Sequence, residues 1–220
     1  MTGGSRLAGM LRSLLIPTLA VLTALALGAL VILSAGESLA DGLDKMVRGY
    51  YGLLDGALLK PHALTNTLVA ATPLILTGLA VAIPFKVGLF NIGGEGQYLM
   101  GATLGVWVGY AVEMPPVIHM LVVLMAGFVG GALWAAIAAV LKARLGSHEV
   151  INTIMLNWIA FHLNDWLVSG PMKAVGPSVE RTPFILPTAE LPRLLPSPDR
   201  LHLGFFVAIL ACVFCWWLLW

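Results

Sequence analysis

Six long runs without a charged side chain divide this sequence, and shorter polar segments separate them. A helix that crosses a membrane needs about 20 predominantly apolar residues. Four of the six runs reach that length, whereas the third and fifth reach it only if a polar group enters the membrane region. The runs extend over residues 13–36, 61–85, 96–112, 114–141, 150–164 and 201–220.

The pattern predicts an all-α polytopic membrane protein of about six transmembrane helices, with residues 1–220 forming a single transmembrane domain. Composition supports this prediction, since 59% of the residues are hydrophobic, 10% are charged and the mean hydropathy is +0.93. Soluble domains carry about 25% charged residues. The first run follows two arginines, as a secretory signal would, but its apolar stretch exceeds the ~7–15 residues of a signal core, so we expect a retained helix.

Positive charge indicates on which side of the membrane each connection lies, because Lys and Arg are enriched in short cytoplasmic loops. The N-terminus carries Arg6 and Arg12, and the connection after the fourth run carries Lys142 and Arg144. We therefore predict a multi-pass protein of the cytoplasmic (inner) membrane with a cytoplasmic N-terminus. The segments predicted to lie outside have mixed charge, and they extend over about residues 37–60 and 170–200.

Small residues recur every four positions in the third and fourth runs, on one face of each expected helix. Such stripes let helix backbones approach closely within a membrane. They are interpreted either as static packing or as a sliding or gating surface. The candidate packing residues are Gly101, Gly105, Gly109, Gly127 and Gly131.

Motifs of catalysis are missing from the sequence, which contains no His-Glu-x-x-His, no Gly-x-Ser-x-Gly and no Walker lysine loop. Its five histidines lack metal-ligand spacing, and its two cysteines, Cys212 and Cys215, lie one helical turn apart in apolar sequence. We therefore expect no catalytic, cofactor-binding or metal site. A net charge of +1 gives no reason to expect a nucleic-acid partner.

The most informative polar stretch joins the second and third runs and reads KVGLFNIGGEGQ over residues 86–97. Each glycine disfavours a regular helix by about 1 kcal/mol relative to alanine. Irregular backbone at membrane depth is tolerated only beside protein or a water-filled cavity, and transport sites often use such breaks. The stretch is thus either a re-entrant break or a plain cytoplasmic turn. The candidate residues of a translocation path or gate are Asn91, Gly93, Gly94, Glu95 and Gln97.

Two motifs carry a resemblance to a known family. The run GLFNIGGEGQYLMGA over residues 88–102 resembles the signature of permease subunits in the branched-chain amino acid, ribose and nucleoside ABC importer family. A second run, LKARLGSHEVINTIMLNWIA over residues 141–160, is similar to the nucleoside branch in particular. The two motifs stand in the same order as in that family, on either side of two expected spans.

The resemblance implies a permease of roughly ten helices that imports a small polar solute, with a nucleoside or simple sugar favoured. It implies cytoplasmic ATPase subunits that hydrolyse ATP on separate chains, a second permease subunit (identical or different) and an extracytoplasmic solute receptor. Asn91, Glu95 and Gln97 would then line or gate the path. The candidate residues of an ATPase-coupling loop are Lys142, Arg144, Gly146 and Glu149.

Two alternatives remain open at this point. An ion-coupled secondary transporter or channel also uses broken helices and intramembrane carboxylates, and Asp165 is a candidate pathway group on either interpretation. Because the family continues beyond a sixth span, we expect this chain to be the N-terminal part of a permease, incomplete at its C-terminus. The alternative is a natural end at Trp220, with tryptophans at the membrane interface.

Overall fold

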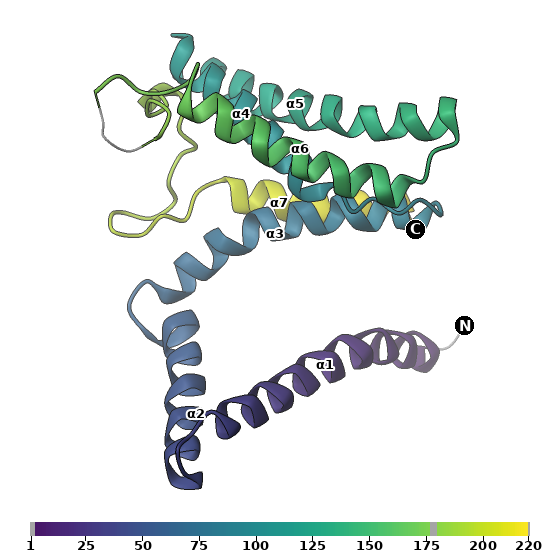
Figure 1. The fold of residues 1–220 in the computed structure, drawn as a ribbon, viewed down its shortest axis with the longest axis vertical. Helices are drawn as coiled ribbons and strands as arrows, with labels where there is room; N and C mark the ends of the chain where they lie inside the picture. Colours follow the sequence, from purple (N-terminus) through teal and green to yellow (C-terminus); the bar gives the residue numbers. More distant parts are fainter. Residues whose placement is uncertain (1–2, 177–179, 220) are drawn as a thin grey trace. The chain divides into compact units, whose positions relative to one another are not determined.

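The computed structural model describes residues 3–176 and 180–219, and α-helices dominate these ranges. The helices form two compact units, residues 1–64 and residues 65–220. No strand occurs in the described ranges, which confirms the all-helical prediction for them. The elements are α1 (Gly3–Ser34), α2 (Leu39–Leu54), the π-helix η1 (Asp55–Leu59), α3 (Ala63–Lys86), α4 (Gly94–Ala111), α5 (Pro116–Leu145), α6 (Glu149–Ser169), the 3₁₀ helix η2 (Pro187–Ala189) and α7 (Gly204–Leu219) (Figure 1).

Each uncharged run of the sequence coincides with one helix, namely α1, α3, α4, α5, α6 or α7. Three stretches among the described residues are long and apolar enough to cross a membrane: Leu14–Ser34 in α1, and the whole of α3 and α5. Helices α4 and α6 carry more polar side chains, and α7 is shorter than a full span. The structure thus supports a polytopic membrane protein, while the count of six spans stays a prediction.

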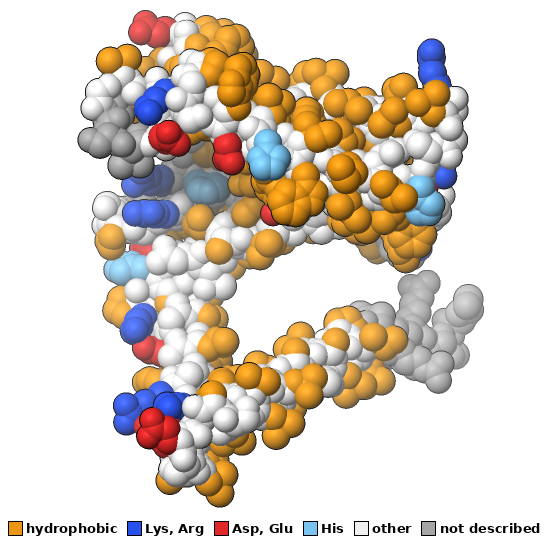
Figure 2. Space-filling view, in the orientation of Figure 1, with side chains coloured by type: hydrophobic (Ala, Val, Ile, Leu, Met, Phe, Trp, Pro, Cys, Tyr) orange, Lys and Arg blue, Asp and Glu red, His pale blue; other side chains and the backbone are white. Residues whose placement is uncertain are grey.

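Helix α2 is an additional element inside the segment that we predicted to lie outside the membrane. It begins at a capping arrangement in which Ser38 Oγ accepts a hydrogen bond from the Asp41 backbone N–H at 3.2 Å. A hydrogen bond from Lys45, followed by one from the Glu37 backbone N–H, lowers the pKa of Asp41. Ion pairs from Asp41 to Lys45 and from Asp44 to Arg48 line its charged side (Figure 2).

Within the first unit, α2 packs closely on α1. A Cβ atom at Gly42 would lie only 2.6 Å from the Leu33 carbonyl oxygen, so this position requires glycine. Farther along, the Tyr50 hydroxyl donates a hydrogen bond to the Leu25 carbonyl. These contacts hold α2 against α1 from Gly42 to Tyr50.

The second unit is built on the antiparallel pair α4 and α5, against which α6 packs (Figure 1). The two helices approach most closely where a Cβ atom at Gly101 would lie 2.7 Å from the Gly127 carbonyl oxygen. Gly131 lies near the Gln97 carbonyl oxygen, and a Cβ atom at Gly105 would be in ordinary contact with Val123. Gly109 faces both Ile185 and α5, because a Cβ atom there would be 2.9 Å from the Ile185 side chain and 3.6 Å from the Val123 side chain.

Apolar side chains cover the outer flanks of this unit (Figure 2). None of the most apolar window of α5 is buried within the structure, and residues such as Phe128 and Leu133 are exposed. A continuous exposed apolar surface of this kind marks contact with a membrane or with another protein. The charged side chains of the unit lie mostly at the two ends of its helices (Figure 2).

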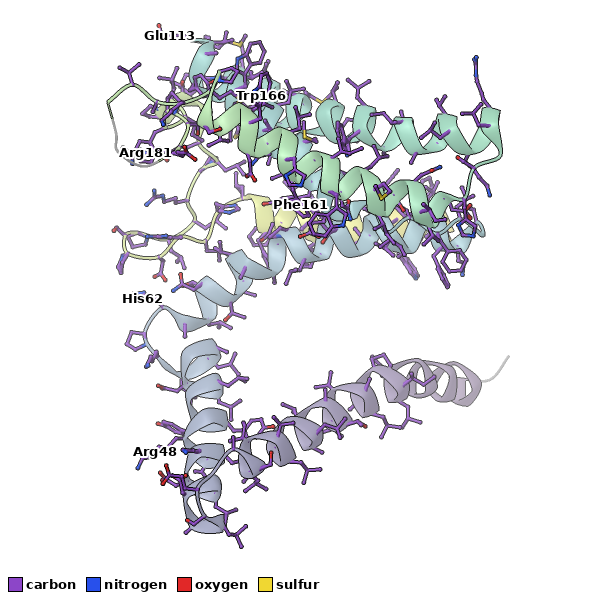
Figure 3. The ribbon with its side chains drawn as sticks, in the orientation of Figure 1. Arg48, His62, Glu113, Phe161, Trp166 and Arg181 are labelled. Carbon is purple, nitrogen blue, oxygen red and sulfur yellow. The ribbon has the colours of Figure 1, made fainter. Side chains whose placement is uncertain are left out.

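The connection between α6 and α7 folds back over one end of the α4–α5 pair. The Leu186 backbone N–H donates to the Gly109 carbonyl at 2.8 Å, and η2 follows directly. His119, fully buried in α5, lies 2.8 Å from the Thr188 hydroxyl through its Nδ1 atom. Glu113 and Arg181 lie at this same end of the unit (Figure 3).

Candidate functional site

The turn between α3 and α4 begins with a glycine-dependent helix stop. Helix α3 ends at Lys86, and Gly88 adopts a left-handed backbone conformation with φ of 82°. The Leu89 backbone N–H then donates to the Pro84 carbonyl at 2.9 Å, which closes the last turn of the helix. This stop leaves residues 87–93 outside any helix, whereas the rest of the predicted break, Gly94–Gln97, forms the first turn of α4.

Asn91 and Gln97 form a pair of side-chain amides across this turn. Asn91 Nδ2 donates to Gln97 Oε1 at 3.1 Å, and Gln97 Nε2 donates to Asn91 Oδ1 at 3.0 Å. Asn91 also donates to the Ala80 carbonyl of α3 and accepts from the Gly93 backbone N–H, at 3.0 Å in each case. The Asn91 amide therefore makes four hydrogen bonds within the protein and fixes the shape of the turn.

The glycines at the start of α4 have different surroundings. A Cβ atom at Gly96 would meet Asn157 Oδ1 at 2.8 Å and Asn157 Cα at 3.0 Å, so the backbone of α6 leaves no space there. At Gly93 the nearest atoms would be 3.1 Å away, on Asn91, Gln97 and Thr153. At Gly94 they would be 3.7 Å away, an ordinary contact. Gly96, which we had not selected, is thus the position most restricted to glycine.

Helix α6 holds the turn through two side chains that sequence reasoning did not select. The Thr153 hydroxyl accepts from the Ile92 backbone N–H at 3.3 Å. The Asn157 amide accepts from the Gly96 N–H and donates to the Ile92 carbonyl, both at 2.9 Å. Polar side chains within an apolar run were the available signal, because such groups are costly in lipid unless they are paired.

The turn between α5 and α6 carries the predicted coupling residues. Gly146 ends α5 in a left-handed conformation with φ of 64°, and its N–H donates to the Lys142 carbonyl at 3.1 Å. The Lys142 ammonium lies 2.6 Å from the carboxylate of Glu149 across this turn. The hydrogen bond that Lys142 donates to Glu149 lowers the pKa of Glu149, and a second hydrogen bond, from the backbone N–H of Glu149 itself, lowers it further. Glu149 directly precedes the uncharged run of α6. Arg144 is exposed.

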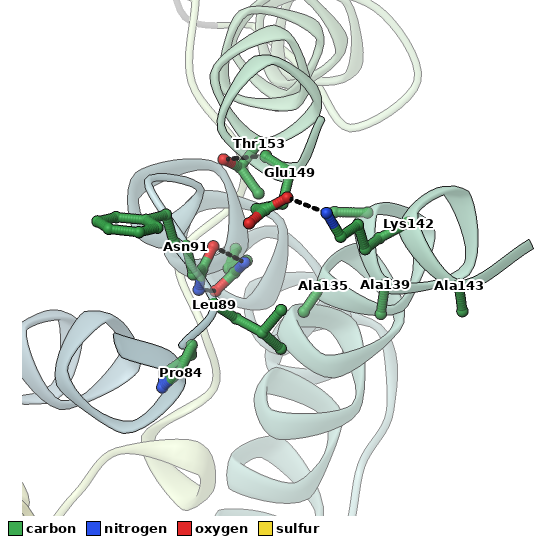
Figure 4. Close-up of a pocket in the computed structure, with 12 residues that line it drawn as sticks. Pro84, Leu89, Asn91, Ala135, Ala139, Lys142, Ala143, Glu149 and Thr153 are labelled. Atoms are coloured by element: carbon green, nitrogen blue, oxygen red, sulfur yellow. Dashed lines mark hydrogen bonds and ion pairs between the residues drawn. The ribbon is translucent and has the colours of Figure 1, made fainter. Parts of the chain in front are cut away.

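A cavity of about 330 Å³ lies between the two turns, with the ion pair at its edge (Figure 4). It brings together residues of both predicted groups, Asn91 and Gln97 from the first and Lys142 and Glu149 from the second. The remaining lining residues are mainly apolar, and they are Pro84, Leu89, Phe90, Ala135, Ala138, Ala139, Ala143 and Thr153.

The other predicted site residues lie around this cavity rather than on its wall. Gly93 and Gly94 are buried at the start of α4, while the Glu95 side chain is exposed in the first turn, where its charge complements the helix N-terminus. Asp165 is exposed near the far end of α6.

The cavity combines apolar walls with a short polar end, so its walls suit an apolar face of a small molecule. The polar groups at that end are the amides of Asn91 and Gln97, the Thr153 hydroxyl and one ion pair, and they bind chiefly to other groups of the protein. Among the described residues, no three His, Cys, Asp or Glu side chains are placed to hold a metal ion together.

Several curated proteins are similar to this chain in sequence. The chain is 41% identical over 213 residues to the guanosine ABC transporter permease of Bacillus subtilis, an alignment covering 95% of this chain and 58% of the relative. It is 36% identical to a glucose ABC transporter permease of Haloferax volcanii, over 90% of this chain and 52% of the relative. It is 32% identical to a nucleoside ABC transporter permease of Lactococcus lactis, over 92% of this chain and 56% of the relative.

The chain therefore spans little more than half the length of these curated relatives. No solved structure matches it. The family model of the branched-chain amino acid transport system permease component matches residues 63–220, a region that includes both turns and the cavity between them. The chain thus belongs to the branched-chain amino acid transport system permease family.

Proposed function

We propose that this chain is part of the transmembrane permease of an ATP-driven importer that carries a nucleoside or a simple sugar across the cytoplasmic membrane. The observation that carries the proposal is the match over residues 63–220 to a permease family. The relatives described above are transporters of guanosine, glucose and nucleosides, and each aligns with at least 90% of this chain. Nucleosides and sugars share a hydroxyl-rich surface with less polar faces.

The six helices that coincide with uncharged runs serve as the spans in this proposal, within a complete permease of roughly ten helices. The arginines at positions 6 and 12, together with Lys142 and Arg144, favour a cytoplasmic N-terminus and a cytoplasmic α5–α6 turn. Residues 37–60 and 170–200 then lie outside, where α2 and η2 stand in the described parts of these segments.

ATP hydrolysis belongs to separate subunits in this proposal, since the sequence contains no phosphate-binding lysine loop. The full assembly contains two ATPase subunits, a second permease subunit and an extracytoplasmic receptor that delivers the solute. Asn91, Gly93, Gly94, Glu95 and Gln97 are proposed to line or gate the path. The loop containing Lys142, Arg144, Gly146 and Glu149 is proposed to meet the ATPase side.

Reconstitution tests this function directly. The complete permease, its ATPase subunits and its receptor are placed in proteoliposomes, and uptake of radiolabelled guanosine and glucose is measured with and without ATP. The expected result is uptake of at least one of the two that requires both ATP and the ATPase subunits. Uptake that persists without the ATPase subunits, or that follows an imposed ion gradient, would instead establish a secondary transporter.

A further inference from the structure

We infer that Thr153 and Asn157 are positioning residues through which α6 holds the α3–α4 turn and transmits movement of the α5–α6 turn to it. This inference rests on the proposed function, because it concerns how the two candidate groups of that permease communicate. The groups are the turn that carries Asn91 and the turn between Lys142 and Glu149.

The contacts between α6 and the turn form a continuous series. Thr153 and Asn157 lie four residues apart, on one face of α6, and together they make three hydrogen bonds to the backbone of Ile92 and Gly96. Farther along the helix, Asn164 Oδ1 accepts from the Thr103 hydroxyl of α4 at 2.8 Å. Thr153, Asn157 and Asn164 are thus directed at one partner, α4 and the turn before it.

Side-chain bonds to the turn replace bonds that a helix would make internally. The Ile92 N–H and carbonyl and the Gly96 N–H all lie at or before the first turn of α4, where a helix leaves its donors without internal partners. Unpaired backbone groups at membrane depth are strongly unfavourable. Thr153 and Asn157 satisfy these groups, so the shape of the turn depends on where α6 stands.

Thr153 also connects this series to the second turn. Its hydroxyl donates to the Glu149 carbonyl at 2.8 Å while accepting from the Ile92 N–H. Glu149 is the residue paired with Lys142 across the three-residue turn that joins α5 to α6. One helical turn of α6 therefore links the ion pair to the backbone of the glycine-rich turn.

Close packing makes the link stiff. The Gly96 backbone lies against the backbone of Asn157, where a Cβ atom would approach Asn157 Cα to 3.0 Å. Two neighbouring positions of α6 are also tightly packed, since Ala160 is fully buried and Leu156 is 8% exposed. A shift of α6 along its axis cannot be absorbed by side-chain adjustment at Gly96 and must move the turn with it.

The first measurement is hydrogen–deuterium exchange of the complete permease complex in nanodiscs, which does not depend on transport. Thr153→Val removes the hydroxyl at constant shape, and Asn157→Leu removes both amide bonds. We expect exchange over residues 89–97 to accelerate by about fivefold per lost bond, with α7 unaffected. Thr153→Ser retains the hydroxyl and should restore the wild-type rate.

Asn152→Leu is the matched control, because Asn152 lies on the same helix but donates to Ser147 rather than to the turn. It should leave exchange over residues 89–97 unchanged. Unchanged exchange in both Thr153→Val and Asn157→Leu would overturn the positioning role.

The second measurement separates positioning from general stability. Uptake per ATP hydrolysed is expected to fall at least several-fold in Thr153→Val, while receptor-stimulated ATP hydrolysis is retained and Thr153→Ser behaves as wild type. If uptake and ATP hydrolysis were lost in parallel, Thr153 would act only in folding, and the inference that it transmits movement between the two turns would be wrong. If the wild-type complex shows no ATP-driven uptake, the proposed function fails, whereas the exchange experiment still decides whether α6 positions the turn.

Discussion

The carboxylate of Glu149 lies 2.6 Å from the ammonium nitrogen of Lys142, across a turn of only three residues. Lys142 stands in the last turn of α5 and Glu149 in the first turn of α6, so each charge also complements the end of its own helix. The pair therefore holds the two helix ends together at the edge of the cavity. Its charge dependence leads to the first prediction.

Glu149→Gln should remove a pH-dependent part of the stability of the complex. The pKa of Glu149 is lowered in the folded protein. Its stabilising contribution is therefore fully present above the ordinary glutamate pKa of 4.5 and is lost as the pH falls through the lower folded value. Thermal unfolding midpoints of wild type and Glu149→Gln should differ at pH 7 and converge as the pH falls through the lowered pKa of the folded state. A constant difference across this range would exclude the ion pair as its cause.

Close approach of α4 and α5 should make Gly101 sensitive to a single methyl group. A Cβ atom there would lie 2.7 Å from a backbone oxygen of Gly127, which no side-chain movement can relieve. Gly101→Ala should therefore destabilise the protein by about 1–3 kcal/mol. Unfolding in mixed detergent micelles, followed by circular dichroism, measures the effect.

Gly78→Ala supplies the matched control for that measurement. Gly78 also lies inside an apolar helix, α3, but nothing lies within 4 Å of a Cβ atom built there. This variant should be neutral or should stabilise the helix by up to about 1 kcal/mol. If both substitutions changed the free energy of unfolding equally, the close contact at Gly101 would not contribute to stability.

Two neighbouring glycines of the turn should differ in the same way when transport is measured. Gly96→Ala places a methyl group against the α6 backbone, whereas Gly94→Ala makes ordinary contacts at 3.7 Å with Thr77. Uptake by the reconstituted complex should fall at least tenfold for Gly96→Ala, an effect of about 1.4 kcal/mol, and by less than twofold for Gly94→Ala. A larger effect at Gly94 would show that the added methyl group obstructs the proposed path, because the packing leaves space for it.

The amide pair gives a further prediction about the proposed path. Gln97→Leu leaves Asn91 without two of its four hydrogen bonds. We expect uptake to be impaired while the protein still inserts and assembles, which membrane fractionation and size-exclusion chromatography check. Normal uptake by Gln97→Leu would contradict a role for the pair.

Orientation can be tested with introduced cysteines in a background where Cys212 and Cys215 are replaced. Ser147→Cys lies in the α5–α6 turn, and Val175→Cys lies at a fully exposed position after α6. An impermeant maleimide should label the Val175 variant in intact cells and the Ser147 variant only after lysis. The reverse pattern would invert the proposed topology.

Charge placement alone predicted most helices, because a charged side chain is costly within lipid. The run at residues 61–85 became α3 over Ala63–Lys86, and the run at 114–141 became α5. Helix α2 was not predicted because Asp41, Lys45 and their neighbours interrupt its apolar residues. Its stability depends on a cap and on contacts with α1.

The candidate site was predictable only in part. Glycine content indicated the break after α3, and charge indicated the α5–α6 turn. The cavity between them could not be predicted, because it forms only when residues such as Asn91 and Glu149 are brought together by packing. Asn157 was missed for the same reason, since its partner Gly96 is 61 residues away in the sequence.

The order of these elements along the chain also matters for biosynthesis. Helix α6 carries Asn157 and Asn164 in its apolar sequence, and amides are poor candidates for insertion into lipid without a partner. Their partners, Gly96 and Thr103, belong to α4 and are synthesised earlier. In the proposed topology, the groups that these amides require are therefore already in the bilayer when α6 is synthesised. A rearranged gene in which α6 preceded α4 would present those amides to acyl chains alone.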